Sequence, residues 1–214
     1  MEFDQFIKEV NQCKKCRLSQ TRNNVVPGEG NQKAEIMFIG EGPGKNEDEQ
    51  GKPFVGAAGK FLDEMLQLIG FRREDIYIAN VVKCRPPGNR DPLPDETEAC
   101  WPWLELQLKL IKPKVIVLLG RHSATRFIPN IHISGEHGQP FRKNIPSLGK
   151  IILYPCYHPA AALYNGGLRQ TLVKDFKKIP KILEIARQTQ LEEEIKKENP
   201  KQQEPNFPKQ SKLF

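Results

Sequence analysis

One stretch decides how this chain is organised: Ile76-Tyr77-Ile78-Ala79-Asn80-Val81-Val82-Lys83-Cys84. Its clustered β-branched and aromatic residues predict a buried strand, and an amide and then a thiol stand toward the carboxyl end of that strand. In open α/β sheets, ligands bind beyond the carboxyl ends of the strands. We therefore expect Asn80 to present a hydrogen-bond donor and an acceptor to a planar ligand, and Cys84 to bind a different group.

The length and composition of the chain favour one globular domain with peripheral additions. Its 214 residues, 38% of them hydrophobic, suffice for one core. The charged amino terminus is unlike a signal peptide, and no apolar run approaches the roughly 18 residues that span a bilayer, so we expect a cytoplasmic protein without membrane contact. The formal net charge of +7, nearly all of it on residues 1–180, favours a polyanionic partner such as nucleic acid.

Strand-like and helix-like segments alternate along the chain. The apolar patterns predict strands near residues 34–39, 76–84, 114–120 and 151–154, and helices near residues 57–69, 95–111 and 168–186. Because strands and helices alternate, we expect a three-layer α/β/α sandwich around a central four-stranded, mainly parallel sheet. This single domain is expected to cover residues 1–188.

The composition changes after this domain. From Glu192 onward the chain consists mainly of Lys, Glu, Gln and Pro, which bury too little apolar surface to become ordered. We therefore expect residues 189–214 to form a flexible tail. Its end, Gln210-Ser211-Lys212-Leu213-Phe214, carries two apolar anchors of the kind found in docking peptides.

The cysteines favour a metal site over disulfides. The chain has five of them and no secretion signal: Cys13, Cys16, Cys84, Cys100 and Cys156. The first two are spaced so that both thiolates reach one ion or cluster, and flanking cationic residues favour the thiolate form. With Cys84 and Cys100 they give a 2 + 1 + 1 pattern, which suits an iron–sulfur cluster at least as well as zinc. The alternative that Cys84 and Cys100 are buried as small hydrophobic residues stays open, and Cys156 lies in an apolar run and is assigned to the core.

Three further elements lie beside the predicted strands and helices. The loop Gly40-Glu41-Gly42-Pro43-Gly44 lets a ligand approach the backbone closely, but it lacks the spacing of a dinucleotide fingerprint or a P-loop. Phe54, next to a proline and near a glycine, is available for stacking on a ligand or for filling the core. His158 leaves a strand end on the same rim as Asn80, with a buried core histidine as the alternative.

Together these motifs resemble one family, the family 4, iron–sulfur-containing uracil-DNA glycosylases. The resemblance spans residues 13–160 in unbroken order. It is carried by Cys13-Lys14-Lys15-Cys16, Gly40-Glu41-Gly42-Pro43-Gly44, Gly51-Lys52-Pro53-Phe54-Val55-Gly56, Asn80-Val81-Val82-Lys83-Cys84-Arg85-Pro86-Pro87, Cys100 and His158-Pro159. It implies a uracil-DNA-glycosylase-like fold and a DNA-repair hydrolase. It also implies a 4Fe-4S cluster ligated by Cys13, Cys16, Cys84 and Cys100.

The resemblance further implies which residues surround the base: Gly40, Glu41 and Gly42 line the uracil pocket, Phe54 stacks on the base, Asn80 pairs with its polar edge and His158 faces its O2. An asparagine accepts from uracil N3–H and donates to O4, whereas cytosine presents the opposite pattern. Stacking and edge hydrogen bonds are the means by which an extruded base is read. A hydrogen bond from His158 to O2 would stabilise the anion that forms as the N-glycosidic bond breaks, so His158 is a catalytic candidate.

The residue that positions the attacking water differs from the familiar pattern. The better-known uracil glycosylases carry an aspartate where Gly42 stands here, which makes Glu41 the second catalytic candidate and Asn89 a weaker one. No lysine stands out as a Schiff-base nucleophile, which favours hydrolysis to an abasic site without strand cleavage. The mostly acidic Lys45-Asn46-Glu47-Asp48-Glu49 replaces the basic insertion of covalently trapping relatives, so we expect no covalent DNA adduct.

The implied partner is uracil-containing DNA, and Arg85 and Arg90 in a proline-rich loop are available to contact its phosphates. The last five residues resemble the clamp-binding ends of archaeal repair proteins, which implies a sliding clamp as a second partner. We expect a monomer in the cytoplasm, associated with the nucleoid of a prokaryote. Two other functions stay open from the residues alone, namely a non-catalytic, metal-containing nucleic-acid-binding module and an enzyme that binds small-nucleotide phosphates.

Overall fold

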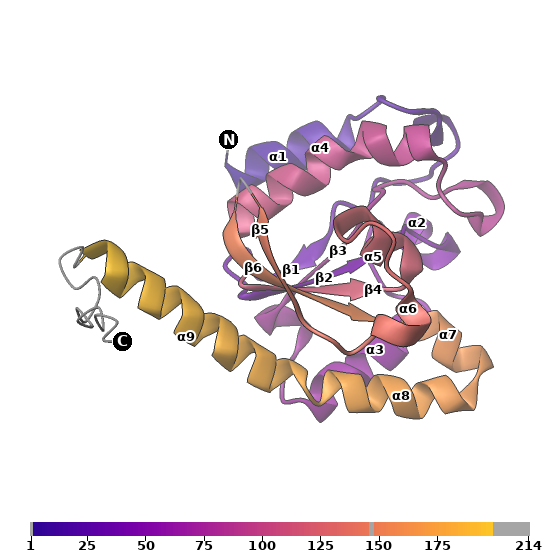
Figure 1. The fold of residues 1–214 in the computed structure, drawn as a ribbon. Coiled ribbons are helices and arrows are strands. Elements are labelled where there is room, and N and C mark those ends of the chain that lie inside the picture. The colour runs from indigo at the N-terminus through magenta and orange to yellow at the C-terminus, as the bar shows by residue number, and fades with distance from the viewer. Residues whose placement is uncertain (1, 146–147, 199–214) are drawn as a thin grey trace, which may run out of the picture.

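A six-stranded mixed sheet forms the centre of the molecule (Figure 1). The computed structural model describes residues 2–145 and 148–198. The strands are β1 Glu29–Gly30, β2 Ile36–Gly40, β3 Tyr77–Asn80, β4 Val115–Leu119, β5 Phe141–Ile145 and β6 Gly149–Cys156. They lie in the order β1-β3-β2-β4-β6-β5. The four central strands pair in parallel, whereas β1 and β5 pair antiparallel at the two edges.

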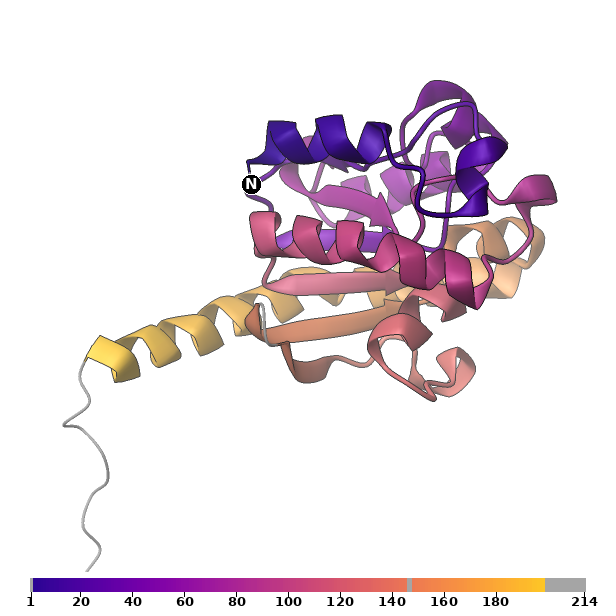
Figure 2. The same ribbon diagram turned by 90° about the horizontal axis from the view of Figure 1, so that it is seen from above.

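Helices cover both faces of this sheet (Figures 1 and 2). The α-helices are α1 Phe3–Asn11, α2 Lys45–Gln50, α3 Ala57–Leu68, α4 Pro94–Ile111, α5 Arg121–Phe127, α6 Ile133–Glu136, α7 Pro159–Tyr164, α8 Gly166–Phe176 and α9 Ile179–Glu198. Short 3-10 turns lie at Arg17–Gln20, Arg73–Asp75 and Pro87–Asn89. Within the described residues, no helix combines the length and apolar composition that crossing a membrane requires.

The central strands β2, β3 and β4 are buried on both faces, because their successive side chains point to opposite sides of the sheet and apolar side chains cover each side. In β2, Phe38 packs toward α3 and α8, where its ring stacks on Phe176 at 5.8 Å between centroids. Its neighbours Met37 and Ile39 pack on the other face, among apolar residues of α4 and α5. The continuous apolar runs in the sequence therefore correspond to parallel strands that are covered twice.

A third apolar cluster attaches α1 to α4, which lie side by side in both ribbon views (Figures 1 and 2). Phe6 and Val10 of α1 are fully buried, and the Phe6 ring meets Trp103 of α4 edge-on at 6.1 Å. Cys84 and Cys100 belong to the same cluster. The amino-terminal helix thus lies over the segment that follows β3.

The structure confirms the predicted α/β sandwich and extends it. The four predicted strands form the parallel centre, but the sheet has six strands, because β1 and β5 add antiparallel edges. Sequence patterns missed both, since β1 has two residues and β5 is mostly exposed. The strand predicted to reach Cys84 ends at Asn80, where the chain bends.

The carboxyl-terminal helix also differs from its prediction. The segment predicted as one helix over residues 168–186 is two helices, α8 and α9, and α9 continues to Glu198. The predicted domain boundary at residue 188 therefore falls inside a helix. The proposed docking end, Gln210-Ser211-Lys212-Leu213-Phe214, lies outside the described residues.

Candidate active site

A cavity of about 340 Å³ opens beyond the carboxyl ends of β2, β3 and β6. It is lined by Glu41, Gly42, Pro43, Gly44, Glu47, Phe54, Ala58, Asn80, Pro86, Asn89, Arg90, Asp91, Pro92, His158 and Ala160. The residues that the sequence placed around one ligand therefore meet in one cavity. Gly40 lies directly against Asn80 and Phe54.

Asn80 provides the unusual polar atom of this cavity. Its side chain is 2% exposed, and its Oδ1 has no hydrogen-bond partner. Leaving a buried acceptor unpaired costs about 1–3 kcal/mol. An acceptor of this kind in a cavity wall indicates a ligand that brings its own donor.

Gly40 lets Asn80 and Phe54 approach each other. A Cβ atom at position 40 would lie 2.5 Å from Asn80 Oδ1 and 2.7 Å from Phe54 Cζ. Any larger residue would therefore push the amide or the aromatic ring out of place. Gly40, the last residue of β2, leaves the space, and Asn80, its register partner in β3, provides the polar group.

Phe54 is held in a backbone conformation that aromatic residues rarely adopt. Its φ is 52°, in the left-handed region, which costs on the order of 1 kcal/mol for a residue with a side chain. Arg73 donates to the carbonyl oxygens of Phe54 at 2.9 Å and Pro53 at 2.6 Å, and also pairs with Asp63 at 3.0 Å. The guanidinium thus fixes the loop that carries the ring.

Glu47 fixes the same loop from the other side. Its Oε1 accepts from the backbone N–H groups of Val55 and Gly56, both at 2.9 Å, and its Oε2 accepts from Gly44 at 3.1 Å. One carboxylate therefore joins the glycine loop to the loop that carries Phe54. Sequence analysis missed this residue, although its position three residues after Gly44 is typical of a helix-capping glutamate.

His158 lies against Phe54, with the ring centroids 5.5 Å apart and the planes inclined by 29°. As the residue that caps α7, it accepts the Ala160 backbone N–H through Nδ1 at 3.1 Å. The neutral ring must then carry its proton on Nε2. Burial lowers the pKa of His158 to about 4, so at neutral pH the ring is a neutral donor through Nε2.

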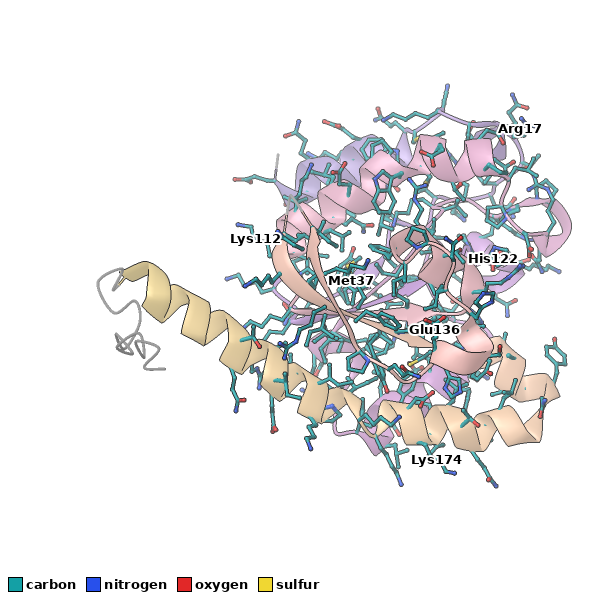
Figure 3. The ribbon with its side chains drawn as sticks, viewed as in Figure 1. Arg17, Met37, Lys112, His122, Glu136 and Lys174 are labelled. Carbon is teal, nitrogen blue, oxygen red and sulfur yellow. The ribbon has the colours of Figure 1, made fainter. Side chains whose placement is uncertain are left out.

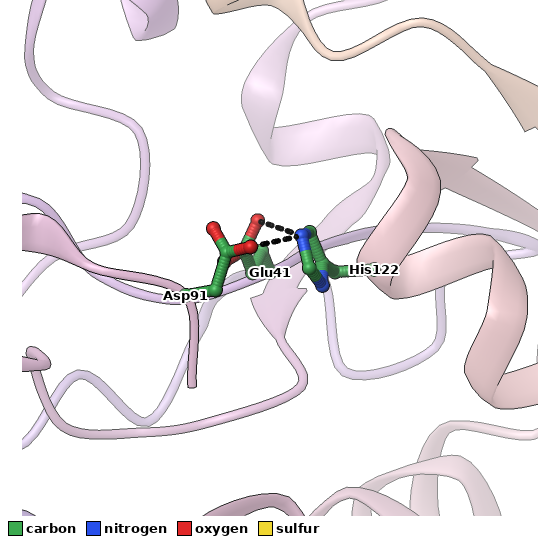
Figure 4. Close-up of side chains that lie close together, drawn as sticks. All are labelled: Glu41, Asp91 and His122. Atoms are coloured by element: carbon green, nitrogen blue, oxygen red, sulfur yellow. Dashed lines mark ion pairs between the residues drawn. The ribbon is translucent and has the colours of Figure 1, made fainter. Parts of the chain in front are cut away.

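Glu41 and Asp91, which line the cavity, lie close to a third ionisable group, His122 (Figure 4). His122 Nε2 lies 2.9 Å from Asp91 Oδ2 and 3.9 Å from Glu41 Oε2. Burial raises the pKa of Glu41, and the nearby His122 partly opposes that rise. Sequence analysis assigned His122 no role. Asp91 lies 31 positions earlier in the chain, and no local pattern predicts that the two side chains meet.

The proline-rich loop is tied down by its arginines. Arg90 forms a bidentate pair with Glu96, at 2.9 and 2.7 Å, and that carboxylate is fully buried. The nearby Arg85 donates through Nε to Asn89 Oδ1 at 2.7 Å. Both arginines thus bind side chains of the protein itself, and these contacts hold the loop along the cavity.

The four cysteines of the predicted metal site form a second, separate cavity. Cys13 and Cys16 follow α1, Cys84 follows β3 and Cys100 lies in α4. None of the four is in a disulfide bond. Segments up to 87 residues apart along the chain thus bring four sulfurs around one small space.

Three of these sulfurs accept N–H hydrogen bonds. The donors are Trp103 Nε1 to Cys13 at 3.1 Å, Arg22 Nη1 to Cys84 at 3.1 Å and the Lys83 backbone N–H to Cys100 at 3.3 Å. Donors of this kind are the outer contacts that orient thiolate ligands and tune the metal they hold. The alternative of cysteines buried only as small hydrophobic residues does not explain these contacts.

The sulfurs are buried, and they lie farther apart than the ligands of a single ion. Burial raises the pKa of Cys100 to about 11, and it also raises the pKa of Cys84, so thiolates here need a compensating cation. Four thiolates on one zinc ion would lie about 3.8 Å apart. Among the described residues, no three of these sulfurs lie within 4.8 Å of one another.

One of the cations beside the first cysteine pair has an acidic partner of its own. Arg17 lies at the surface (Figure 3) and pairs with Asp95 at 2.6 Å. Burial raises the pKa of Cys16, although nearby Arg22 acts in the opposite direction. The flanking charges therefore do not by themselves produce a thiolate.

The fold and the two cavities define an α/β protein in which a cavity with an aromatic and an amide in its wall lies near a site of four cysteines. The family model of the uracil DNA glycosylase superfamily matches residues 27–184. This chain belongs to that superfamily and, within it, to type 4. The type-4 uracil-DNA glycosylase of Sulfurisphaera tokodaii is 52% identical over 183 residues, which cover 80% of each chain.

Two further relatives define the position of the chain in the superfamily. The type-4 uracil-DNA glycosylase of Archaeoglobus fulgidus is 51% identical over 184 residues, covering 83% of this chain and 91% of its own. The type-5 uracil-DNA glycosylase of Thermus thermophilus is 29% identical over 192 residues, covering 74% of this chain and 87% of its own. The chain is therefore much closer to these type-4 proteins than to this type-5 protein.

Proposed function

We propose that this protein removes uracil from DNA by hydrolysing the N-glycosidic bond, leaving an abasic site without cleaving the strand. The observation that carries the proposal is the unpaired, buried Oδ1 of Asn80 in the same cavity as Phe54. The match to the uracil DNA glycosylase superfamily supports it independently. A nucleotide must leave the duplex to enter such a cavity.

The amide of Asn80 selects the base. Its Oδ1 accepts from uracil N3–H, and its Nδ2 donates to O4. Cytosine would place an acceptor opposite the acceptor Oδ1 and a donor opposite the donor Nδ2, so both hydrogen bonds would be lost. Because a buried polar group left unpaired costs about 1–3 kcal/mol, two such losses disfavour cytosine strongly.

Phe54 provides the surface on which the base stacks. Arg73 and Glu47 hold the loop from opposite sides, so the ring is ordered before the base arrives. Such preorganisation lowers the entropic cost of binding.

His158 stabilises the leaving group. As the glycosidic bond breaks, its electrons enter the uracil ring and place negative charge on O2 and O4. The neutral imidazole donates from Nε2 to O2, because Nδ1 is occupied by the Ala160 N–H. A preorganised donor of this kind is typically worth about 3–4 kcal/mol in the transition state.

Glu41 orients the attacking water. Its carboxylate lies beside the cavity, and His122 favours its ionised form against the effect of burial. Asn89 is the weaker candidate, since Arg85 already occupies its Oδ1. No covalent intermediate is required, because water attacks the oxocarbenium-like sugar directly.

Cys13, Cys16, Cys84 and Cys100 hold a 4Fe-4S cluster. When bound, the cluster supplies four metal–thiolate bonds that fasten the amino-terminal segment to α4 and to the end of β3. All four ligands belong to the second cavity, which supports a structural role. A brown colour, with iron and sulfide in the purified protein, tests this assignment against zinc.

The partner is uracil-containing DNA, which the protein meets as a monomer in the cytoplasm of a prokaryote, at the nucleoid. The overall charge of +7 supports binding to a polyanion. The terminal residues Leu213 and Phe214 are proposed to dock a sliding clamp. Removing residues 209–214 should abolish clamp pull-down without changing excision.

Alkali treatment of DNA tests the central reaction. The protein is incubated with matched single- and double-stranded oligonucleotides that carry one uracil or one thymine, and hot alkali then cleaves abasic sites. Cleavage at uracil alone, and only after alkali, is expected. Intact uracil strands would leave the non-catalytic nucleic-acid-binding module as the better description.

A further inference from the structure

A third cavity, of about 310 Å³, plays no part in the proposed reaction. Lys114, which directly precedes β4, lines it together with Lys150 and Ile151 from the first residues of β6. It therefore lies at the amino ends of these parallel strands, whereas the base cavity opens beyond their carboxyl ends. A base held for excision does not occupy this third cavity, which is called the basic cavity below.

The walls of the basic cavity carry charge of one sign. Four cationic residues line it, Lys114, Arg142, Lys143 and Lys150, and none of its described lining residues is acidic. Lys114 pairs with Glu35 at 2.9 Å. Within residues 2–145 and 148–198, neither Arg142 nor Lys143 forms an ion pair. The cavity therefore attracts an anionic partner.

The floor of the basic cavity is apolar. Ile151 and Ile152 of β6 and Ala186 of α9 line it, and each of the three is nearly completely buried. Ile152 and Ala186 belong to the apolar cluster between the sheet and α9. A ligand that fits both the floor and the walls must combine an apolar group with negative charge.

The strand that forms one wall has an open edge. In the described part of the chain, β5 is the last strand of the sheet and pairs with β6 alone. The register places Arg142 opposite Ile152 and Asn144 opposite Lys150, so the side chains of Arg142 and Asn144 lie on the face of the sheet that α9 covers. An edge strand presents unpaired backbone N–H and C=O groups, which a further extended chain can pair with.

We propose that the basic cavity and the edge of β5 together bind an extended segment of a partner protein, in which acidic residues flank an apolar side chain. The apolar side chain enters the floor at Ile152 and Ala186, the acidic residues meet Arg142 and Lys143, and the backbone pairs with β5. The open strand edge favours a polypeptide over a nucleic acid, because only a polypeptide can extend the sheet. This site is independent of the reaction at the base cavity.

Selection from a library of short random peptides displayed on phage tests the proposal with the full-length protein. Enriched peptides are synthesised with a fluorescent label, and their Kd is measured by fluorescence polarisation. Acidic peptides with a central apolar residue are expected. Arg142→Glu should raise their Kd about tenfold, because an attractive charge pair becomes a repulsive one.

A second variant tests the floor without changing the charge. Thr189 of α9 lines the cavity, and in Thr189→Trp the indole fills the space that the apolar side chain of the peptide would occupy. The Kd should again rise about tenfold, the effect of losing roughly two buried methylene groups. Should Arg142→Glu fail to accumulate, the neutral Arg142→Gln must weaken binding in the same direction.

Two controls separate a specific site from general charge and from misfolding. Lys8→Glu makes the same change of charge at an exposed lysine of α1, and it should leave the Kd unchanged. All of these variants should excise uracil at the wild-type rate, because none of the altered residues lines the base cavity.

Three results would overturn the proposal and leave the glycosylase assignment intact. Selection that enriches no acidic peptide would mean that Arg142 and Lys143 only protect the strand edge from aggregation. Peptides that bind the wild type and both cavity variants equally would bind elsewhere. Displacement of the peptide by uracil-free duplex DNA from the wild type, but not from Lys8→Glu controls lacking Arg142, would identify the cavity as a nucleic-acid surface.

Discussion

The base cavity and the four-cysteine site lie at the two ends of one short segment, residues 80–84, yet their polar atoms are in opposite states. In the base cavity, Asn80 Oδ1 is buried without a partner. At the cysteine site, three sulfurs accept N–H hydrogen bonds from the surrounding protein. One region leaves a buried acceptor unpaired, and the other supports its atoms with hydrogen bonds from the surrounding protein.

This difference indicates that the two sites have different roles, one in binding a transient ligand and one in stabilising the fold. A buried polar atom without a partner lowers stability. It is tolerated where a transient ligand provides the missing hydrogen bond. Sulfurs supported by outer hydrogen bonds are typical of ligands that hold a resident group. The comparison therefore predicts that damage to the cysteine site unfolds the protein, whereas damage to the base cavity impairs the reaction and spares the fold.

Replacing a cysteine ligand should give the largest effect. Cys84→Ser is expected to lower the free energy of unfolding by more than about 5 kcal/mol, because metal–ligand bonds contribute directly to folding. Urea unfolding and iron content measure this. The matched control is Cys156→Ser, another fully buried cysteine, which should retain its iron. Equal iron loss in both variants would contradict the assignment of ligands.

Replacing His158 should affect the reaction and spare the fold. His158→Ala is expected to lower kcat about a hundred- to a thousandfold, or about 3–4 kcal/mol, with little change in KM. Single-turnover excision of uracil measures the chemical step. A change confined to KM would mean that the histidine contributes to binding alone.

The pH dependence of stability should also reveal His158. Its pKa is about 4 in the folded protein, below the ordinary value of about 6.5 for a histidine in an unfolded chain. Between these values the unfolded state binds a proton that the folded state does not, so stability falls as the pH falls from 6.5 toward 4. Acidification from pH 7 to pH 4 should therefore destabilise the wild type by about 3 kcal/mol more than it destabilises His158→Asn. Parallel stability curves for the two proteins would show that burial does not disfavour the charged ring.

Removing the stacking surface should have the smallest of these effects. Phe54→Ala is expected to lower kcat/KM about tenfold, corresponding to about 1–2 kcal/mol of stacking. Arg73→Met should act in the same direction and more weakly, since it loosens the loop but keeps the ring. Excision assays under kcat/KM conditions, with Leu68→Ala as an exposed apolar control on α3, measure both. An Arg73 effect larger than the Phe54 effect would show that the loop has another role.

The sequence predicted those parts of the molecule that are carried by strong local patterns. The continuous apolar runs of β2, β3, β4 and β6 predicted the parallel centre of the sheet, because strands covered on both faces have no polar alternation. The ends of those strands also indicated the rim on which Asn80 and His158 lie. A short strand such as β1 and a polar edge strand such as β5 carry no comparable pattern.

The sequence could not predict the residues whose importance depends on tertiary contacts. Asp91 and His122 are 31 positions apart and meet only because the proline-rich loop folds over α5. Arg73 reaches the carbonyls of Pro53 and Phe54 across 20 and 19 positions. Lys83 lies between Asn80 and Cys84 in the sequence. Its burial and its hydrogen bond to the Asn80 carbonyl are evident only in the folded chain.

The central claim is that the amide of Asn80 selects uracil, and the Asn80→Asp variant tests it most directly. The measurement is the ratio of kcat/KM for excision of uracil to that of cytosine, from otherwise identical oligonucleotides. A carboxylate cannot donate to O4, so the ratio should fall at least about tenfold, with the loss of one good hydrogen bond. A ratio equal to that of the wild type would contradict the account.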